Sequence, residues 1–171
     1  MRLRSSIALL LSLAACSQPL DWREVRPEGS ALTLLMPCRP QRQARDVDLG
    51  GQPLHLVLHA CSAGGHTWAL AFADLDDPAR VDGVLRALQR AAVGNIGAAQ
   101  TAALPLDVPG ATPNAASGRV ALGGRLPDGS EVREQVAVFA YGTRVFQATA
   151  VGPQLPDEAV GAFFASLRLR S

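Results

Sequence analysis

The first half of the chain carries apolar residues at every second position. Leu54, Leu56 and Leu58 are separated by single residues, and this period of two is that of a strand with one face in a core. Gly50 and Gly51 precede this strand, and a glycine pair predicts a two-residue hairpin because both positions tolerate positive φ. With the neighbouring apolar runs, the pattern predicts strands at 32–36, 43–49, 52–61 and 67–73.

After the fourth predicted strand, the spacing of the apolar residues changes to that of a helix. Asp77 is suited to cap a helix and Pro78 to occupy its first position, so Asp76 and Asp77 are interpreted as a helix start and not as a paired-carboxylate site. Gly94 and Asn95 supply the stop, which gives a helix of about 16 residues. Its predicted buried face consists of Val81, Val84, Leu85, Leu88 and Ala92.

The second half of the chain repeats the change from strand to helix. Pro127 and Gly129 form a turn between two apolar runs, since proline presets φ and glycine accepts positive φ. Asp157 and Glu158 follow Pro156 at the start of a final short helix. Predicted strands lie around 102–108 and at 119–126, 132–141 and 145–151, and the final helix has an apolar face of Val160, Phe163, Phe164 and Leu167.

The order of strands, helix, strands and helix predicts an α+β fold. We expect a mostly antiparallel sheet of about six to eight strands, with the middle helix and the C-terminal helix packed on it. The early strand ending in proline, the single middle helix, the long later hairpins and the closing segment AFFASLRL at 162–169 resemble the PsbP-like superfamily. The resemblance covers most of a single domain at 22–171. It implies a sandwich fold and a non-catalytic accessory or binding role.

The N-terminus resembles a bacterial lipoprotein signal. Arg2 and Arg4 precede an apolar run at 7–15 that ends in the lipobox Leu13-Ala14-Ala15-Cys16. The run is about half the roughly 20 residues that a membrane span requires. We therefore expect residues 1–15 to be a cleaved signal, Cys16 to be lipidated, and 16–21 to form a short tether.

Lipoprotein sorting implies a location for the anchored chain. Aspartate directly after the lipidated cysteine is the signal that retains such proteins in the inner membrane, and here that position is Ser17. The resemblance therefore favours the periplasmic face of the outer membrane over the inner membrane. The expected partners are membrane lipid, through acylated Cys16, and another protein of the envelope.

Composition excludes several function classes. All 16 basic residues are arginine, so there is no lysine for a Schiff base or a P-loop. Removal of Arg2 and Arg4 leaves 14 basic residues against 15 acidic ones. This balance, without a basic cluster, argues against nucleic-acid binding. No cofactor motif is present, and we expect no cofactor.

Cys38 and Cys61 remain as an even pair once Cys16 is assigned to lipid. In an oxidising compartment such a pair predicts a disulfide. The alternative is a metal site formed by His59, Cys61 and His66, because His59 and Cys61 share one face of a strand across a two-residue step.

Catalytic motifs are missing from the sequence. The stretch 62–66 contains serine, two glycines and histidine, but the chain has no G-x-S-x-G elbow, and a hairpin loop explains the stretch better. The sequence therefore predicts a membrane-anchored, non-catalytic protein that binds an envelope component or assists assembly. The alternative function is binding of a small ligand or metal in a groove between the sheet and a helix.

Overall fold

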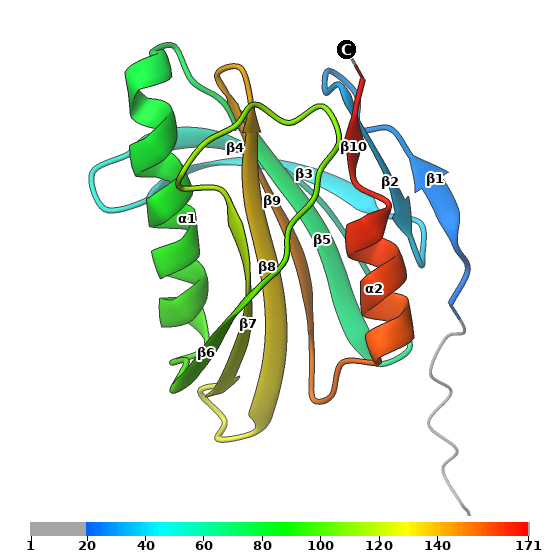
Figure 1. Ribbon diagram of the computed structural model, residues 1–171. Helices are drawn as coiled ribbons and strands as arrows, with labels where there is room; N and C mark the ends of the chain where they lie inside the picture. Colours follow the sequence, from blue (N-terminus) through cyan, green and yellow to red (C-terminus); the bar gives the residue numbers. More distant parts are fainter. Residues whose placement is uncertain (1–19, 171) are drawn as a thin grey trace, which may run out of the picture.

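The computed structural model describes residues 20–170. They form an α+β fold, as predicted, with the elements arranged in layers (Figure 1). A seven-stranded antiparallel sheet lies in the middle, with α1 on one side and α2 with a three-stranded sheet on the other. The elements are β1 (Arg23–Val25), β2 (Leu32–Met36), β3 (Gln41–Asp48), β4 (Pro53–Ala63), β5 (His66–Asp74), a 3₁₀ turn (Pro78–Arg80), α1 (Val81–Asn95), β6 (Gln100–Leu104), β7 (Gly118–Arg125), β8 (Glu131–Tyr141), β9 (Arg144–Gly152), α2 (Asp157–Ala165) and β10 (Arg168–Leu169).

The large sheet has the strand order β3-β4-β5-β9-β8-β7-β6. The predicted hairpin between β3 and β4 is confirmed, with φ of 67° at Gly50 and 84° at Gly51. The predicted helix is confirmed as the 3₁₀ turn followed by α1, and Asp77 caps its start because its Oδ1 accepts a hydrogen bond of 2.8 Å from Ala79 N. Asp77 therefore has the structural role that the sequence predicts.

Four elements differ from the sequence prediction. The strand expected around 102–108 is β6 at Gln100–Leu104, and it ends before Pro105, whose nitrogen cannot donate to a ladder. The closing helix ends at Ala165, before Leu167 of its predicted apolar face, and Leu169 of β10 pairs with Leu32 of β2. The short strands β1 and β10 raise the number of strands to ten, above the six to eight expected.

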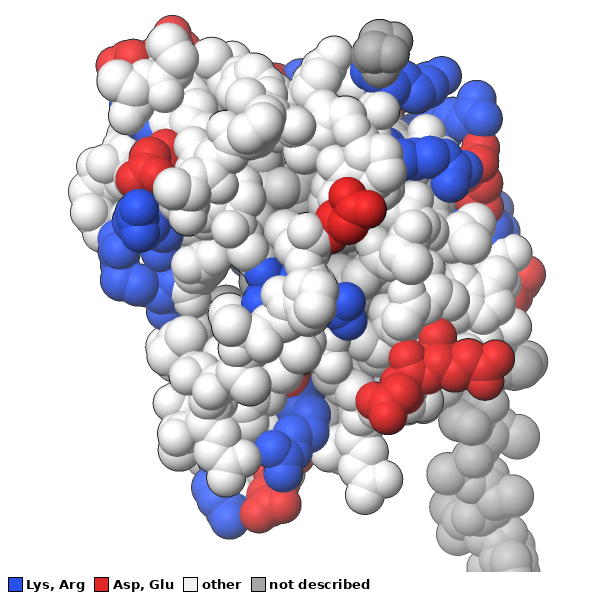
Figure 2. Space-filling view, in the orientation of Figure 1, with Lys and Arg blue, Asp and Glu red and all other residues white. Residues whose placement is uncertain are grey.

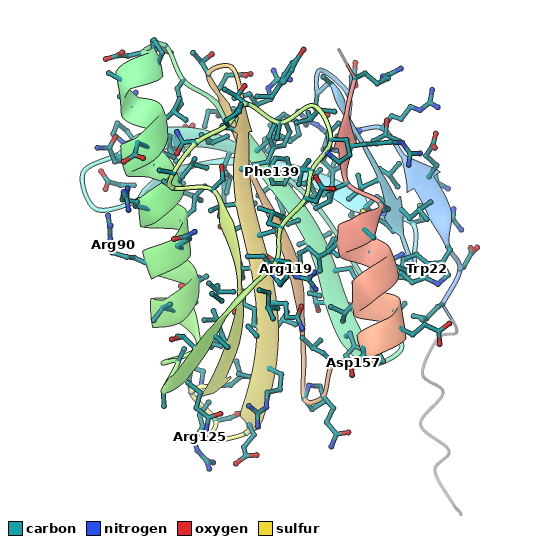
Figure 3. The ribbon with its side chains drawn as sticks, viewed as in Figure 1. Trp22, Arg90, Arg119, Arg125, Phe139 and Asp157 are labelled. Atoms are coloured by element: carbon teal, nitrogen blue, oxygen red, sulfur yellow. A yellow bond between two sulfur atoms is a disulfide. The ribbon has the colours of Figure 1, made fainter. Side chains whose placement is uncertain are left out.

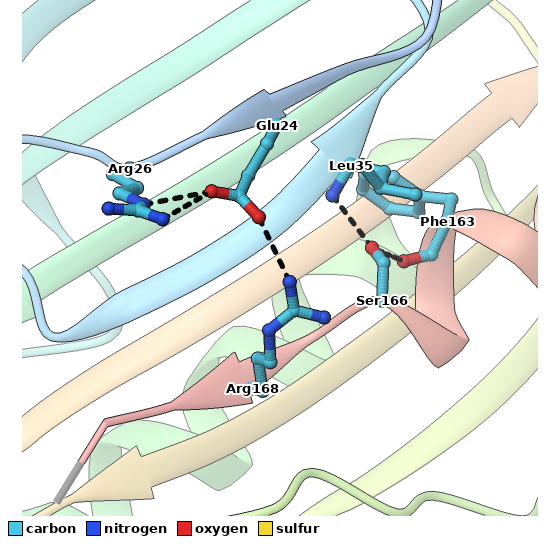
Figure 4. Close-up of polar contacts among 6 residues, drawn as sticks. All are labelled: Glu24, Arg26, Leu35, Phe163, Ser166 and Arg168. Atoms are coloured by element: carbon cyan, nitrogen blue, oxygen red, sulfur yellow. Dashed lines mark hydrogen bonds and ion pairs between the residues drawn. The ribbon is translucent and has the colours of Figure 1, made fainter.

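Ser166 joins the end of α2 to the three-stranded sheet (Figure 4). Its hydroxyl donates to the carbonyl of Phe163 at 2.6 Å and accepts from the backbone N–H of Leu35 at 2.8 Å. Beside it, Arg168 of β10 forms an ion pair of 3.0 Å with Glu24 of β1. These contacts hold the second layer together as one unit.

Both faces of the large sheet are covered, and each face has its own core. The face toward α1 packs Val84 and Leu88 of the helix against Val136 and Val145 of the sheet. The opposite face packs aromatic residues, and these are Trp68, Phe72, Phe139, Phe146, Phe163 and Phe164. The molecule therefore offers two separate spaces for a site, one under each covering layer.

Charged side chains are dispersed over the face shown in Figure 2. Acidic and basic groups alternate around its margins, and no large area of this face carries one sign. The acidic first turn of α2, formed by Asp157 and Glu158, lies at its lower end (Figure 3). Such a surface lacks the basic stripe that nucleic acids select.

Candidate functional site

Cys38 and Cys61 are joined in a disulfide, with their Cα atoms 5.9 Å apart. Cys38 follows β2 and Cys61 lies in β4, so the bridge links the three-stranded sheet to the large sheet. The structure thus pairs the two cysteines that the sequence pairs. Cys16 and the predicted signal lie outside the described residues.

His59 and His66 have separate surroundings, although the sequence groups them with Cys61 as an alternative metal set. His59 is buried with its ring stacked on Phe72 at a centroid distance of 6.2 Å, and burial lowers the pKa of this imidazole. The Nε2 atom of His66 contacts the carbonyl oxygen of Gln154. Cys61 is committed to the disulfide, and residues 20–170 contain no group of three or more metal-ligating side chains around a common point.

A cavity of about 250 Å³ lies between α1 and the large sheet. Its floor contains Ala69 and Ala71 of β5, whose small side chains leave the space open. Leu56 and Leu58 of β4 form one wall, and Leu88 of α1 contributes to the opposite wall. The cavity is therefore lined mostly by apolar side chains and lies between the sheet and a helix, but none of His59, Cys61 and His66 lines it.

Glu134 of β8 contributes a carboxyl group to this cavity. The residue is only 7% exposed, and its strand neighbours on the same face are Val132 and Val136. Burial raises the pKa of Glu134 to about 7, and no hydrogen bond or ion pair within residues 20–170 offsets this effect. The carboxyl group therefore has no protein partner within residues 20–170, and water or a ligand in the cavity supplies its hydrogen bonds.

Four further polar side chains line the cavity besides Glu134, and these are Arg45, Asn95, Gln147 and Thr149. Gln147 Nε2 donates a hydrogen bond of 3.2 Å to the hydroxyl of Thr149, and both residues line the cavity. No histidine, cysteine or second carboxyl group lines it, so among the described residues Glu134 has no acid–base partner there. The arrangement supplies hydrogen-bond acceptors inside an apolar space, which is the chemistry of a binding site.

The sequence contained a signal for Glu134 that pattern analysis passed over. Val132, Val136 and Val138 occupy alternate positions of β8, and Glu134 interrupts this apolar series. A charged residue on the buried face of a strand is rare unless it is paired or functional. Which residues would surround it could not be deduced, because the cavity is formed by strands and a helix distant in the sequence.

The comparisons with known proteins supply no family for this chain. No protein-family model and no curated protein sequence matches it. Among residues 20–170, no helix has both the length and the apolar character needed to cross a bilayer. The function is therefore argued from the residues of the site.

Proposed function

We propose that this chain is a non-catalytic binding protein of the bacterial envelope, and that its ligand occupies the cavity beside Glu134. The observation that carries the proposal is a mostly buried carboxyl group that has no protein partner among residues 20–170, in a cavity lined mostly by apolar side chains. Among the described residues Glu134 has no acid–base partner in that cavity, and this supports a binding role. The α+β architecture with a middle and a closing helix supports the resemblance to the PsbP-like superfamily.

The chemistry of the cavity indicates the class of ligand. An ionised carboxylate only accepts hydrogen bonds, so the ligand must donate one or more to Glu134. The leucine and alanine walls favour a short apolar body. A small amphipathic amine satisfies both requirements, because its ammonium group pairs with the carboxylate while its alkyl chain covers the apolar walls.

We expect hexylamine to bind the full chain at least tenfold more tightly at pH 8 than at pH 5.5. The amine is cationic at both values, whereas Glu134, with a pKa of about 7, is mostly ionised only at the higher one. The chain carries Cys16→Ser in this experiment so that no lipid competes for the amine. Titration followed by the NMR signals of Leu56 and Leu88 measures the dissociation constants.

The variant Glu134→Gln keeps the shape of the side chain and removes its charge. We expect it to weaken hexylamine binding at pH 8 by tenfold or more and to abolish the pH dependence. Glu131→Gln on the same strand is the control, since Glu131 is exposed and pairs with Arg125. Equal affinity of the wild type and Glu134→Gln, or no saturable binding, would contradict the proposal.

We also propose that Cys16 attaches the protein to the outer membrane, with the domain facing the periplasm. The lipobox and the short basic n-region support this proposal. Each buried methylene of an acyl chain contributes about 0.8 kcal/mol, so two or more chains give stable attachment. Membrane lipid and a second envelope protein are the proposed partners.

We expect Cys16→Ser to move the protein from the membrane fraction to the soluble fraction and to abolish incorporation of labelled palmitate. Ser17→Asp is the informative second variant, because aspartate at this position retains lipoproteins in the inner membrane. It should remain acylated and should shift from the outer to the inner membrane on a density gradient. Labelling of Cys16→Ser would show that Cys16 is not the attachment point.

A further inference from the structure

A second cavity, of about 300 Å³, lies on the other face of the large sheet. It is bounded by β6, β7, β8 and the segment that leads into α2, from which Leu155 contributes. The pairing of β7 with β8 sets Gly123 opposite Arg133 and Ala121 opposite Gln135. Glu134 of β8 borders both cavities, but strand alternation turns its side chain to the α1 side.

Arginine and glutamine side chains make this second cavity rich in hydrogen-bond donors. Arg133 Nη1 donates to Gln100 Oε1 at 3.1 Å, and Arg119 Nη2 donates to Gln135 Oε1. Because each amide oxygen faces a guanidinium, the orientation of both amides is fixed and both Nε2 groups remain as donors. Neither Nε2 group has a hydrogen-bond acceptor within residues 20–170, and both glutamines line the cavity.

Arg119 adds a half-buried positive charge next to the cavity. It extends from β7 toward α2 (Figure 3), and its Cζ lies 3.9 Å above the ring of Phe164. Its Nε is buried without a partner, and burial lowers the pKa of the guanidinium. Among the described residues, no carboxylate pairs with Arg119 or Arg133. The half-buried Arg119 and the exposed Arg133 together give this place a positive potential, which favours an anion.

Gly123 keeps room for Arg133 to reach across the sheet. A Cβ at position 123 would lie 2.7 Å from Arg133 Nη1 and 3.3 Å from Gln100 Oε1. The glycine therefore permits the contact that orients both side chains. The remaining floor is formed by Ala102 and Ala121, which are small and apolar.

We propose that this second cavity binds a small organic carboxylate. The carboxylate group accepts from Arg133 and from the free Nε2 groups of Gln100 and Gln135, while Arg119 contributes electrostatic attraction. The apolar body of the ligand covers Ala102 and Ala121 and contacts Leu155. This site is separate from the cavity beside Glu134 and does not depend on the function proposed there.

The test uses the full chain with Cys16→Ser and follows the NMR signals of the arginine Nε–Hε and glutamine Nε2 groups. The probes are hexanoate, benzoate and acetate, with hexylamine and inorganic phosphate for comparison. We expect saturable shifts at Arg133, Gln100 and Gln135 with hexanoate or benzoate, and at least tenfold weaker effects with acetate. Hexanoate should leave the signals of Leu56 and Leu88 in the first cavity unshifted, which separates the two sites.

Two variants probe the site without removing a core side chain. Arg133→Gln and Gly123→Ala should each weaken binding of the tighter carboxylate tenfold or more. The matched controls are Arg90→Gln on α1 and Gly161→Ala on α2, where an added Cβ meets no atom within 4 Å. The proposal is wrong if no carboxylate binds, if phosphate or hexylamine shifts the same signals equally well, or if all four variants bind alike.

Discussion

Trp68→Ala is expected to lower the free energy of unfolding by about 4 kcal/mol. The side chain of Trp68 is 0% exposed and lies at the centre of the interface between the large sheet and the second layer. Its ring meets that of Phe163 at a centroid distance of 5.3 Å and that of Trp22 at 6.1 Å, both edge to face. Alanine would leave a cavity that neither the sheet nor the helix can close.

Unfolding in guanidinium chloride, followed by far-ultraviolet circular dichroism, measures this loss. Trp22→Ala is the control, because Trp22 packs against the same core while only partly buried. Trp22→Ala should lower the free energy of unfolding by less than half as much as Trp68→Ala does. A loss below about 1 kcal/mol for Trp68→Ala would show that the two layers are not joined through this side chain.

Glu134→Gln is expected to stabilise the protein at pH 8 by on the order of 2 kcal/mol and to change little at pH 5. The folded state raises the pKa of Glu134 from 4.5 to about 7, so the unfolded chain releases this proton first as the pH rises. The free energy of unfolding of the wild type therefore falls as the pH rises from about 4.5 to about 7, and it stays lower above pH 7. Glutamine does not ionise and avoids this loss.

Urea unfolding at both pH values tests this difference, with Glu131→Gln as the exposed control. The control should stay within about 0.5 kcal/mol of the wild type at both values. If the free energies of unfolding of Glu134→Gln and the wild type differed by the same amount at pH 5 and pH 8, burial would not be raising the pKa of this carboxyl group. The result bears on the ligand proposal as well, because the same group must ionise to bind an amine.

Local signals in the sequence were sufficient for most of the fold. The glycine pair at 50–51, the cap at Asp77 and the helical spacing from Val81 to Ala92 each act through backbone preferences within a few residues. The two short strands were missed for the opposite reason. β1 and β10 exist because β2 lies between them, and a strand of two or three residues carries too few positions to show a period.

The candidate sites were harder to predict than the fold. His59 and His66 attract attention by residue type, yet their surroundings are aromatic packing and a backbone carbonyl. Glu134 and Arg119 became significant only through what the fold places next to them. The burial of a side chain and the charges around it depend on segments that are distant in the sequence. They therefore leave no local pattern in a single sequence.

The edges of the large sheet have a consequence for encounters between copies of this protein. β3 is one edge, and its side chains are exposed at every position except Val47. Charges of both signs line it, at Arg42, Arg45, Asp46 and Asp48, which makes it a poor template for another strand. The opposite edge, β6, is five residues long and is followed by proline. Neighbouring copies can thus collide at high local density without joining their sheets into fibres.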